Sequence, residues 1–255
     1  MNVFITGASS GIGEALAHEF AARGARLGLA ARRTDALKAV IASLPGQQHL
    51  IYGVDVTNTE AIAAAGREFD VAVGGADIVI ANAGISIGVK TEHYEDLAQF
   101  RRVFETNVFS MPATFHPFIA PMKTRRRGTL VGIASVAGIR GLPGSDAYCA
   151  SKSAVITYCE SLRVEMAKHG IKVVTISPGF IRTPLTAKNP YGMPFLMDAP
   201  EFARRAADAM IAGARYRTIP WQMGAATALL KVMPRWLFDR ITKRRKQKPR
   251  VTAGN

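Results

Sequence analysis

The chain has 255 residues, of which 48% are hydrophobic, enough to bury one large core. Its formal net charge is +14, but residues 231–250 alone carry nine lysines and arginines against one aspartate, or +8. Because this excess is local and lacks a platform of interleaved aromatic and basic residues, we expect no nucleic-acid partner.

Neither a signal peptide nor a membrane span is expected. Residues 1–6 already read as a strand, and no apolar run reaches the ~18–20 residues of a transmembrane helix. The two cysteines, Cys149 and Cys159, lie in one predicted helix and are too few for a disulfide framework. We expect both to be reduced thiols in a cytoplasmic protein.

In chain order, short apolar segments alternate with longer amphipathic ones. The apolar segments predict strands at residues 3–6, 26–31, 49–54, 77–81, 129–134 and 172–176. Between them, helices are predicted at residues 13–23, 35–43, 59–73, from 94 to 109 and onward, and 146–169. Strands without polar alternation, interleaved with helices, are typical of a parallel sheet covered on both faces. We predict an α/β fold with a doubly wound, Rossmann-type parallel sheet in a single domain.

The first strand leads into a glycine-rich turn, Thr6-Gly7-Ala8-Ser9-Ser10-Gly11-Ile12-Gly13, and then into a helix. Backbone N–H groups and the positive helix end at such a turn favour a dinucleotide pyrophosphate. The glycine spacing differs from the standard dinucleotide fingerprint, so an ordinary strand–helix turn is the alternative. The position after the first strand of an α/β pattern favours the nucleotide.

Two arginines, Arg32 and Arg33, follow the second strand. An acidic residue at this strand end would bind a ribose 2′-hydroxyl, whereas guanidinium groups bind a 2′-phosphate. We assign Arg32 to the phosphate, while Arg33 also fits a solvated residue at a helix start. The pair predicts NADPH in preference to NADH.

Two further strand ends contribute polar residues. Asp55 and Val56 follow the third strand, where they could edge an adenine, and Asn82-Ala83-Gly84 follows the fourth. The carboxyl ends of parallel strands are where ligands of such folds bind, although each segment also fits a simple turn.

A tyrosine and a lysine, Tyr148 and Lys152, are four residues apart on a predicted helix and share one face. An isolated tyrosine titrates near pH ~10, and a neighbouring ammonium is expected to lower that pKa. Ser135 follows the fifth strand and can donate a hydrogen bond to an oxygen that develops negative charge. A surface pair is the alternative, but the three residues together with the glycine turn favour catalysis.

Over residues 1 to about 220, the chain resembles the compact branch of the short-chain dehydrogenase/reductase family. The resemblance implies a catalytic tetrad of Asn107, Ser135, Tyr148 and Lys152, with no departure at any of these positions. It implies that Asn107 holds a water for proton relay and that Lys152 also binds the nicotinamide ribose. Residues 178–183 are implied to touch the nicotinamide carboxamide.

With these assignments, the expected cofactor site comprises Gly7, Ser9, Ser10, Gly11, Ile12, Gly13, Arg32, Arg33, Asp55, Val56, Asn82, Ala83, Gly84, Tyr148, Lys152, Pro178, Gly179, Ile181 and Thr183, and no metal. The implied reaction is reversible hydride transfer between NADPH and a ketone or secondary alcohol. Relatives usually pair through the helices at 94–109 and 146–169, which implies a homodimer or homotetramer.

The resemblance implies that the cofactor domain spans residues 1–220 and includes a substrate lid at residues 183–213. This stretch contains Leu185, Tyr191, Met193, Phe195, Leu196 and Met197. Their apolar side chains predict a hydrophobic or lipid-like substrate, and a role in lipid metabolism. Packing of the lid on the body is the alternative.

Residues 221–255 form a predicted C-terminal extension. It has an apolar part, 223–241, and a cationic part, 243–250, which could lie on an anionic membrane surface such as the inner membrane. Pro234 is expected to divide the apolar part into two short helices. Docking of the apolar part on the body or on a partner subunit, and a solvated, disordered basic end, remain open alternatives.

A different class of function is a non-catalytic NADP(H)-binding regulator or scaffold with the same fold. The intact tetrad argues against this alternative, because a regulator has no need of Tyr148 and Lys152 together.

Overall fold

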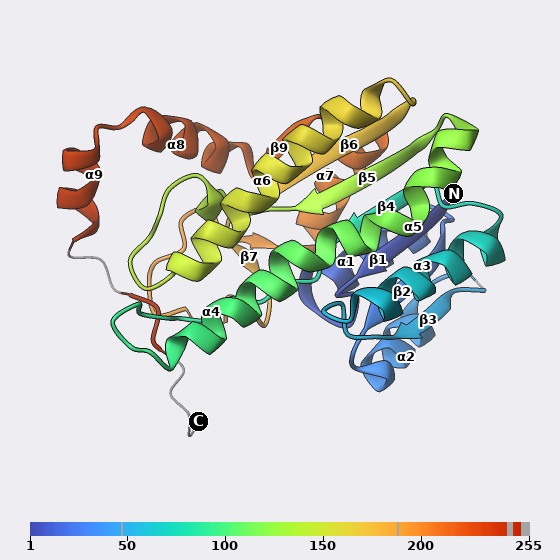
Figure 1. Cartoon of the computed structure of the whole chain (residues 1–255), viewed down its shortest axis with the longest axis horizontal. Helices are drawn as coiled ribbons and strands as arrows, with labels where there is room; N and C mark the ends of the chain where they lie inside the picture. Colours follow the sequence, from blue (N-terminus) through green and yellow to red (C-terminus); the bar gives the residue numbers. More distant parts are fainter. Residues whose placement is uncertain (47, 188, 244–246, 251–255) are drawn as a thin grey trace.

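Seven parallel strands form one sheet at the centre of the molecule (Figure 1). The computed structural model describes residues 1–46, 48–187, 189–243 and 247–250. The strand order is β3-β2-β1-β4-β5-β6-β9. The bounds are β1 (Asn2–Thr6), β2 (Arg26–Ala31), β3 (Leu50–Gly53), β4 (Ile78–Ala81), β5 (Gly128–Ile133), β6 (Ile171–Pro178) and β9 (Tyr216–Ile219). The order reverses between β1 and β4, the position at which ligands of doubly wound sheets bind.

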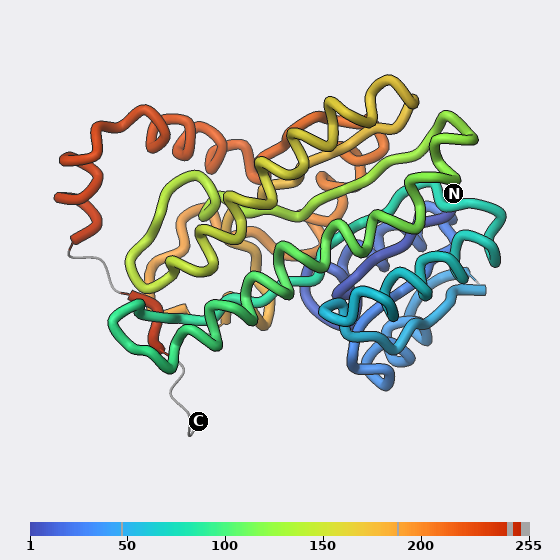
Figure 2. Tube along the Cα trace, viewed as in Figure 1, coloured from blue at the N-terminus to red at the C-terminus, as the bar shows by residue number. Residues whose placement is uncertain are grey.

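Helices cover both faces of this sheet (Figure 2). One layer consists of α1 (Gly11–Ala22), α2 (Thr34–Ser43) and α7 (Ala199–Ala212). The other consists of α3 (Thr59–Val73), α4 (Asp96–Phe104), α5 (Ser110–Arg125) and α6 (Asp146–Ala167). The predicted doubly wound α/β architecture is confirmed.

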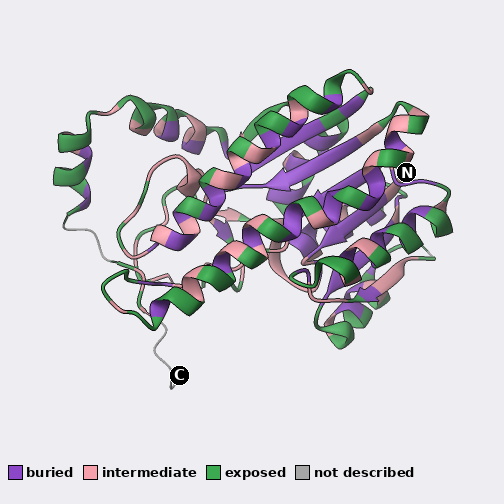
Figure 3. Ribbon diagram, viewed as in Figure 1, coloured by how far each residue is buried: buried purple, intermediate pink, exposed green. Residues whose placement is uncertain are grey.

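A hydrophobic cluster fills each space between sheet and helices, so the strands are almost wholly buried in Figure 3. On the α3–α5–α6 side, the Phe4 ring lies 5.4 Å from the Phe69 ring and 5.3 Å from the Phe118 ring, between centroids. On the other side, Leu16 and Phe20 of α1 pack with Phe202 of α7. Apolar side chains on alternate sides of each strand feed both clusters.

The helix predicted from residue 94 has a different course in the structure. It begins as α4 at Asp96, passes through a π-helical turn at Glu105–Phe109, and continues as α5. The turn contains one buried residue, Asn107, and π-helical turns frequently mark functional sites.

Two elements were missing from the sequence prediction. Helix α7 lies inside the range assigned to the lid, yet its apolar face is fully buried against α1. Strand β9 closes the sheet beside β6. The short strand β7 (Ile181–Arg182), just before the lid region, pairs with β8 (Met197–Asp198) within it.

The C-terminal extension contains two short helices, α8 (Trp221–Val232) and α9 (Arg235–Thr242), separated at Pro234 as predicted. They form an arm beside the body, after which residues 247–250 return to the start of α4 (Figure 1). Over the described residues, no helix has the length and apolar character needed to cross a membrane.

The buried position of Phe202 makes α7 part of the core rather than of a mobile lid. Replacement by Ala should therefore lower the free energy of unfolding by about 3–5 kcal/mol, as measured by urea denaturation. The matched change Phe195→Ala removes the same atoms from a side chain that is 53% exposed. That change should stay within about 0.5 kcal/mol of wild type. Equal effects of the two changes would contradict the core role of α7.

Candidate active site

A cavity of about 490 Å³ opens at the carboxyl ends of the parallel strands. Every residue predicted to contact the cofactor lines it except Gly13, and Ser135 lines it too. The site therefore draws together segments from residue 7 to residue 183, as the strand-end argument required. Arg102, Thr106 and Ile85 also line the cavity and were missed. Only the folded chain brings them there, from helix α4, the π-helical turn after it and the loop after β4, respectively.

The glycine turn after β1 is shaped by close packing. Gly7 and Gly11 have φ angles of +67° and +62°, which favour glycine. A Cβ on Gly13 would lie 2.3 Å from the Gly7 carbonyl oxygen and 2.6 Å from Nδ2 of Asn82. Gly13 thus seats the helix against the turn rather than facing the cavity. The first-turn N–H groups of α1 have no partner within the helix, so they can bind an anion.

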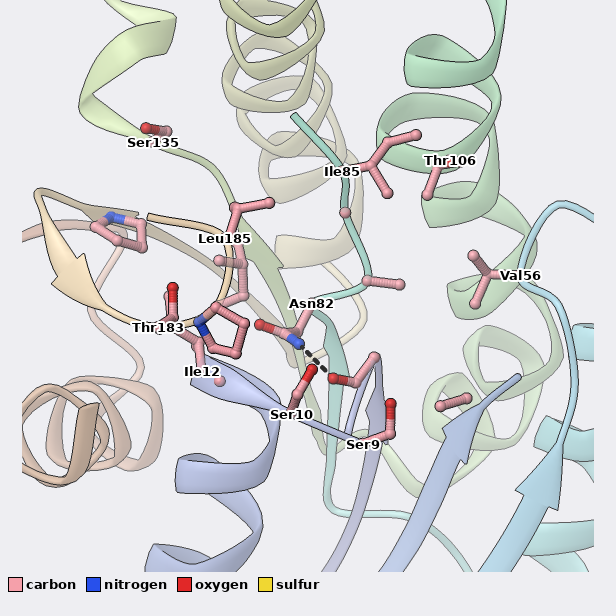
Figure 4. Close-up of a pocket in the computed structure, with 18 of the residues that line it drawn as sticks. Ser9, Ser10, Ile12, Val56, Asn82, Ile85, Thr106, Ser135, Thr183 and Leu185 are labelled. Atoms are coloured by element: carbon pink, nitrogen blue, oxygen red, sulfur yellow. Dashed lines mark hydrogen bonds between the residues drawn. The ribbon is translucent and has the colours of Figure 1, made fainter. Parts of the chain in front are cut away.

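Asn82 and Thr6 join the ends of β4 and β1. The Asn82 side-chain amide donates to the Thr6 carbonyl oxygen at 2.9 Å and to the Gly7 carbonyl oxygen at 3.3 Å. A dashed line from Asn82 marks the second of these bonds in Figure 4. The Thr6 hydroxyl accepts from the N–H groups of Asn82 and Ala83, both at 3.1 Å. Thr6 was named from the sequence as the first residue of the glycine-rich turn, but its role in joining the two strand ends was not predicted.

The basic side chains are arranged around the opening near β2. Arg33 donates to the hydroxyls of Ser9 at 3.2 Å and Ser10 at 2.9 Å, so it lies over the turn. Arg32 lies 3.6 Å from the Asp55 carboxylate. Burial raises the pKa of Asp55, but hydrogen bonds from Thr57 and the charges of Arg32 and Arg102 bring it below its usual value. Two guanidinium groups, those of Arg32 and Arg102, therefore act on the Asp55 carboxylate, while Arg33 is bonded to the glycine turn.

A second cavity of about 270 Å³ adjoins the first, and Ser135 and Tyr148 line both. Its wall is mainly apolar and includes Phe180, Leu185, Tyr191, Phe195, Met223 and Leu230. Of the predicted lid side chains, Met193, Leu196 and Met197 do not line it, and Met197 packs on the core instead. A reacting carbon between the cavities would lie beside Tyr148 and Ser135.

Burial controls the protonation of Tyr148 and Lys152. The Lys152 ammonium donates to the Ile133 carbonyl oxygen at 2.7 Å, and burial lowers its pKa to about 8. Burial raises the pKa of Tyr148 to about 12, while a hydrogen bond with Ser135 acts in the opposite direction. The expected lowering of the Tyr148 pKa is thus wrong for this structure. The physical reason is that Lys152 is directed to a carbonyl, 5.9 Å from the centroid of the Tyr148 ring.

Asn107 does not line either cavity but holds the surrounding segments together. Its side chain donates to the Ile85 carbonyl oxygen at 2.9 Å and to the Ser151 hydroxyl at 3.0 Å, and accepts from Ile85 N–H at 2.8 Å. Ser151 in turn donates to the Tyr148 carbonyl oxygen at 2.8 Å. Asn107 therefore positions the part of α6 that carries Tyr148. That Asn107 also holds a water for proton relay stays a prediction.

The C-terminal extension reaches this site. Met223 and Leu230 of α8 line the second cavity, and Arg140 from the loop before α6 donates to the carbonyl oxygens of Leu230 and Met233, both at 3.2 Å. Docking of the apolar part on the body was one of the alternatives left open by the sequence. Residues 247–250 of the cationic part dock on the body as well, which was not predicted from the sequence. Residues 244–246 of the cationic part lie outside the described residues.

Comparison with known proteins identifies the family. Residues 1–192 match the family model described as short chain dehydrogenase. The chain is 38% identical to an uncharacterised oxidoreductase of Myxococcus xanthus over 242 residues, covering 94% of this chain and 95% of the relative. A short-chain dehydrogenase structure from Streptomyces avermitilis superposes with a TM-score of 0.79 at 26% identity, covering 95% of this chain and 98% of that one. A levodione reductase structure gives 0.79 at 28% identity, covering 88% and 98%.

The lowered pKa of Lys152 makes stability depend on pH in a defined direction. Between pH 8 and 10.5 the unfolded lysine holds a proton that the folded one has released, so the free energy of unfolding should rise with pH. Lys152→Met removes this contribution. The stability of the variant relative to wild type should therefore decline by up to about 3 kcal/mol across this range, measured by urea denaturation.

The control for this experiment is Lys168→Met, which changes an exposed lysine beyond the end of the same helix. It should leave the pH dependence of wild type unchanged. A stability difference between Lys152→Met and wild type that is constant with pH would contradict the assigned shift.

Proposed function

The chain belongs to the short-chain dehydrogenase/reductase family, and we propose that it is an NADPH-dependent reductase of apolar ketones that also oxidises the corresponding alcohols. The observation that carries the proposal is the junction of the two cavities at Ser135 and Tyr148. One cavity has the features of a dinucleotide site, and the other is small and mainly apolar. A carbonyl group at the junction would meet both hydroxyls.

The residues present fit a nicotinamide dinucleotide. The glycine turn leaves no room for side chains at positions 7 and 13, and the first-turn N–H groups of α1 suit a pyrophosphate. Segment 178–183 borders the same cavity beyond the turn, where Thr183 lies against Gly11. When bound, the dinucleotide supplies or accepts the hydride.

The charge near β2 supports NADPH as the preferred form. Arg32, Arg33 and Arg102 line this cavity, against the single carboxylate of Asp55. A ribose 2′-phosphate would replace part of the Asp55 charge as a partner for these guanidinium groups and would accept charge-assisted hydrogen bonds. Arg33, already held over the turn by Ser9 and Ser10, is as well placed for this contact as Arg32.

The proton chemistry follows from the protonation states. With a pKa of about 12, Tyr148 is a neutral phenol at physiological pH and can donate its proton to a carbonyl oxygen. Ser135 accepts from Ala137 N–H at 3.1 Å and is hydrogen-bonded to Tyr148, so a substrate oxygen at the junction would take the place of the Tyr148 oxygen as the acceptor for the Ser135 hydroxyl. Oxidation requires the phenolate, which burial disfavours. Neutral pH therefore favours reduction.

The same proposal includes association with a membrane surface and assembly into an oligomer. The arm of α8 and α9 exposes large apolar side chains, namely Trp221, Leu229, Val232, Trp236 and Ile241. This face supports peripheral association with an anionic inner membrane surface in the cytoplasm, and a lipid-like substrate would suit that location. A homodimer or homotetramer through α4 and α6 is the assembly we propose.

Tyr148→Phe should lower kcat for ketone reduction by ~100- to 10,000-fold, because it removes the proton donor while keeping the ring. The affinity for NADPH, measured by fluorescence titration, should not change. Tyr158→Phe makes the same change on the same helix, outside both cavities, and should retain wild-type activity. A Tyr148→Phe protein with wild-type activity would favour the non-catalytic NADP(H)-binding regulator.

Cofactor preference should depend on the two arginines after β2. Arg32→Asp and Arg33→Asp should each weaken NADPH binding by ~10- to 100-fold, because a guanidinium contact is lost and a repelling carboxylate added. NADH binding should change much less. Arg67→Asp, on the exposed side of α3, is the control for net charge. Equal affinities of the wild type for NADPH and NADH would refute the preference.

A further inference from the structure

One wall of the substrate cavity comes from the far end of the chain. Lys248 lines the second cavity, and its ammonium donates to the Ser86 hydroxyl, also a lining residue, at 2.7 Å. Ser86 follows β4, so this contact joins residues 162 positions apart. Sequence analysis had placed Lys248 in a cationic cluster for a membrane or for solvent.

The segment that carries Lys248 is anchored two residues after it, at Arg250. Arg250 donates to both carboxylate oxygens of Asp96, at 2.8 and 2.9 Å, and its backbone pairs with Gly88. A Cβ on Gly88 would lie 2.1 Å from the Pro249 carbonyl oxygen, and one on Gly144 would lie 3.1 Å from Lys248 N. Two glycines of the body thus make room for the segment, so Lys248 has a defined place.

The Arg250 contact also lowers the pKa of its partner, Asp96. The hydrogen bond from Arg250 holds the pKa of Asp96 at about 2, below its usual value. Asp96 is nearly buried at the start of α4 and also accepts from Lys90 N–H at 2.8 Å. The anchor is therefore a hydrogen-bonded ion pair, a stronger contact than an exposed pair.

Among the described residues that line the cavity, the Lys248 ammonium has no carboxylate as a counter-ion. No aspartate or glutamate is among the residues that line the cavity, and within the described residues Lys248 has no carboxylate within 4.0 Å. The other lining cation, Arg140, is engaged by the carbonyl oxygens of Leu230 and Met233 and by the Phe238 ring. Burial lowers the pKa of Lys248, as expected for an ammonium that has lost water without gaining a counter-ion.

We propose that Lys248 binds an anionic group on the substrate, a carboxylate in the simplest case, so that the enzyme reduces apolar oxo acids. This inference rests on the proposed function, since Tyr148 and Lys248 line one cavity of about 270 Å³. The apolar wall receives the hydrocarbon part of the substrate, Tyr148 meets its ketone, and Lys248 meets its carboxylate. A carboxylate there also accepts hydrogen bonds that an ester cannot replace.

The test uses methyl-ketone acids with two to six methylene groups between ketone and carboxylate, each paired with its methyl ester. For the acid length that reacts best, wild-type kcat/KM should exceed that of the ester, and the difference should lie in KM. In Lys248→Met the ratio of kcat/KM for the acid to kcat/KM for the ester should fall ~10- to 100-fold. Lys231→Met removes an exposed lysine of α8 and should behave as wild type.

A binding measurement separates this inference from the proposed function. Octanoate has no ketone, so its affinity for the NADPH-loaded protein, compared with that of octanamide, reports on anion binding alone. Octanoate should bind wild type ~10- to 100-fold more tightly than Lys248→Met, with NADPH affinity equal in both proteins. Equal octanoate affinities, or an acid preference that survives in Lys248→Met, would overturn the role of Lys248. Failure to reduce any ester would count against the reductase proposal instead.

Discussion

The hydrogen bond from the Lys152 ammonium to the Ile133 carbonyl oxygen, 2.7 Å long, is the contact on which the geometry of the site depends. It joins the second turn of α6 to Ile133, the last residue of β5. Ser135 follows Ile133 by two residues. Tyr148 lies one helical turn before Lys152. One buried charge thus sets the relative position of the two hydroxyls that face the substrate, at the cost of keeping an ammonium out of water.

This arrangement requires glycines at the positions where two backbone segments approach each other closely. A Cβ on Gly138 would lie 2.7 Å from the Lys152 carbonyl carbon, so the short segment after Ser135 could not otherwise lie on α6. On the opposite side of the site, Gly13 allows α1 to approach Gly7 and Asn82 in the same way. The cavity for the dinucleotide and the junction with the substrate cavity both follow from these close approaches, which a parallel sheet brings to one edge.

Much of this site could be predicted because its signals are local. Thr6 to Gly13, and Tyr148 with Lys152, are short patterns whose meaning depends on the adjoining strand or helix, and the structure places them as expected around one cavity. What could not be predicted depends on burial or on distant contacts. The Tyr148 pKa is set by its surroundings rather than by the lysine four residues away. Helix α7 had a readable apolar face at Phe202, Ala206 and Met210, but the family resemblance had assigned its residues to the substrate lid.

The C-terminal extension shows most clearly that distant contacts could not be predicted from the sequence. It forms a wall of the substrate cavity and also exposes an apolar surface. Helix α8 turns Met223 and Leu230 toward the substrate cavity, while Trp221, Leu229 and Val232 face outward. The segment after α9 adds Lys248 to the cavity and commits Arg250 to Asp96, 154 residues earlier in the chain. Two of the basic residues that the sequence analysis assigned to a membrane surface or a solvated end, Lys248 and Arg250, thus make contacts within the molecule. Removing the whole extension would open the substrate cavity and delete the exposed apolar face together. Only substitutions on one face of α8 at a time can separate a membrane role from a catalytic one.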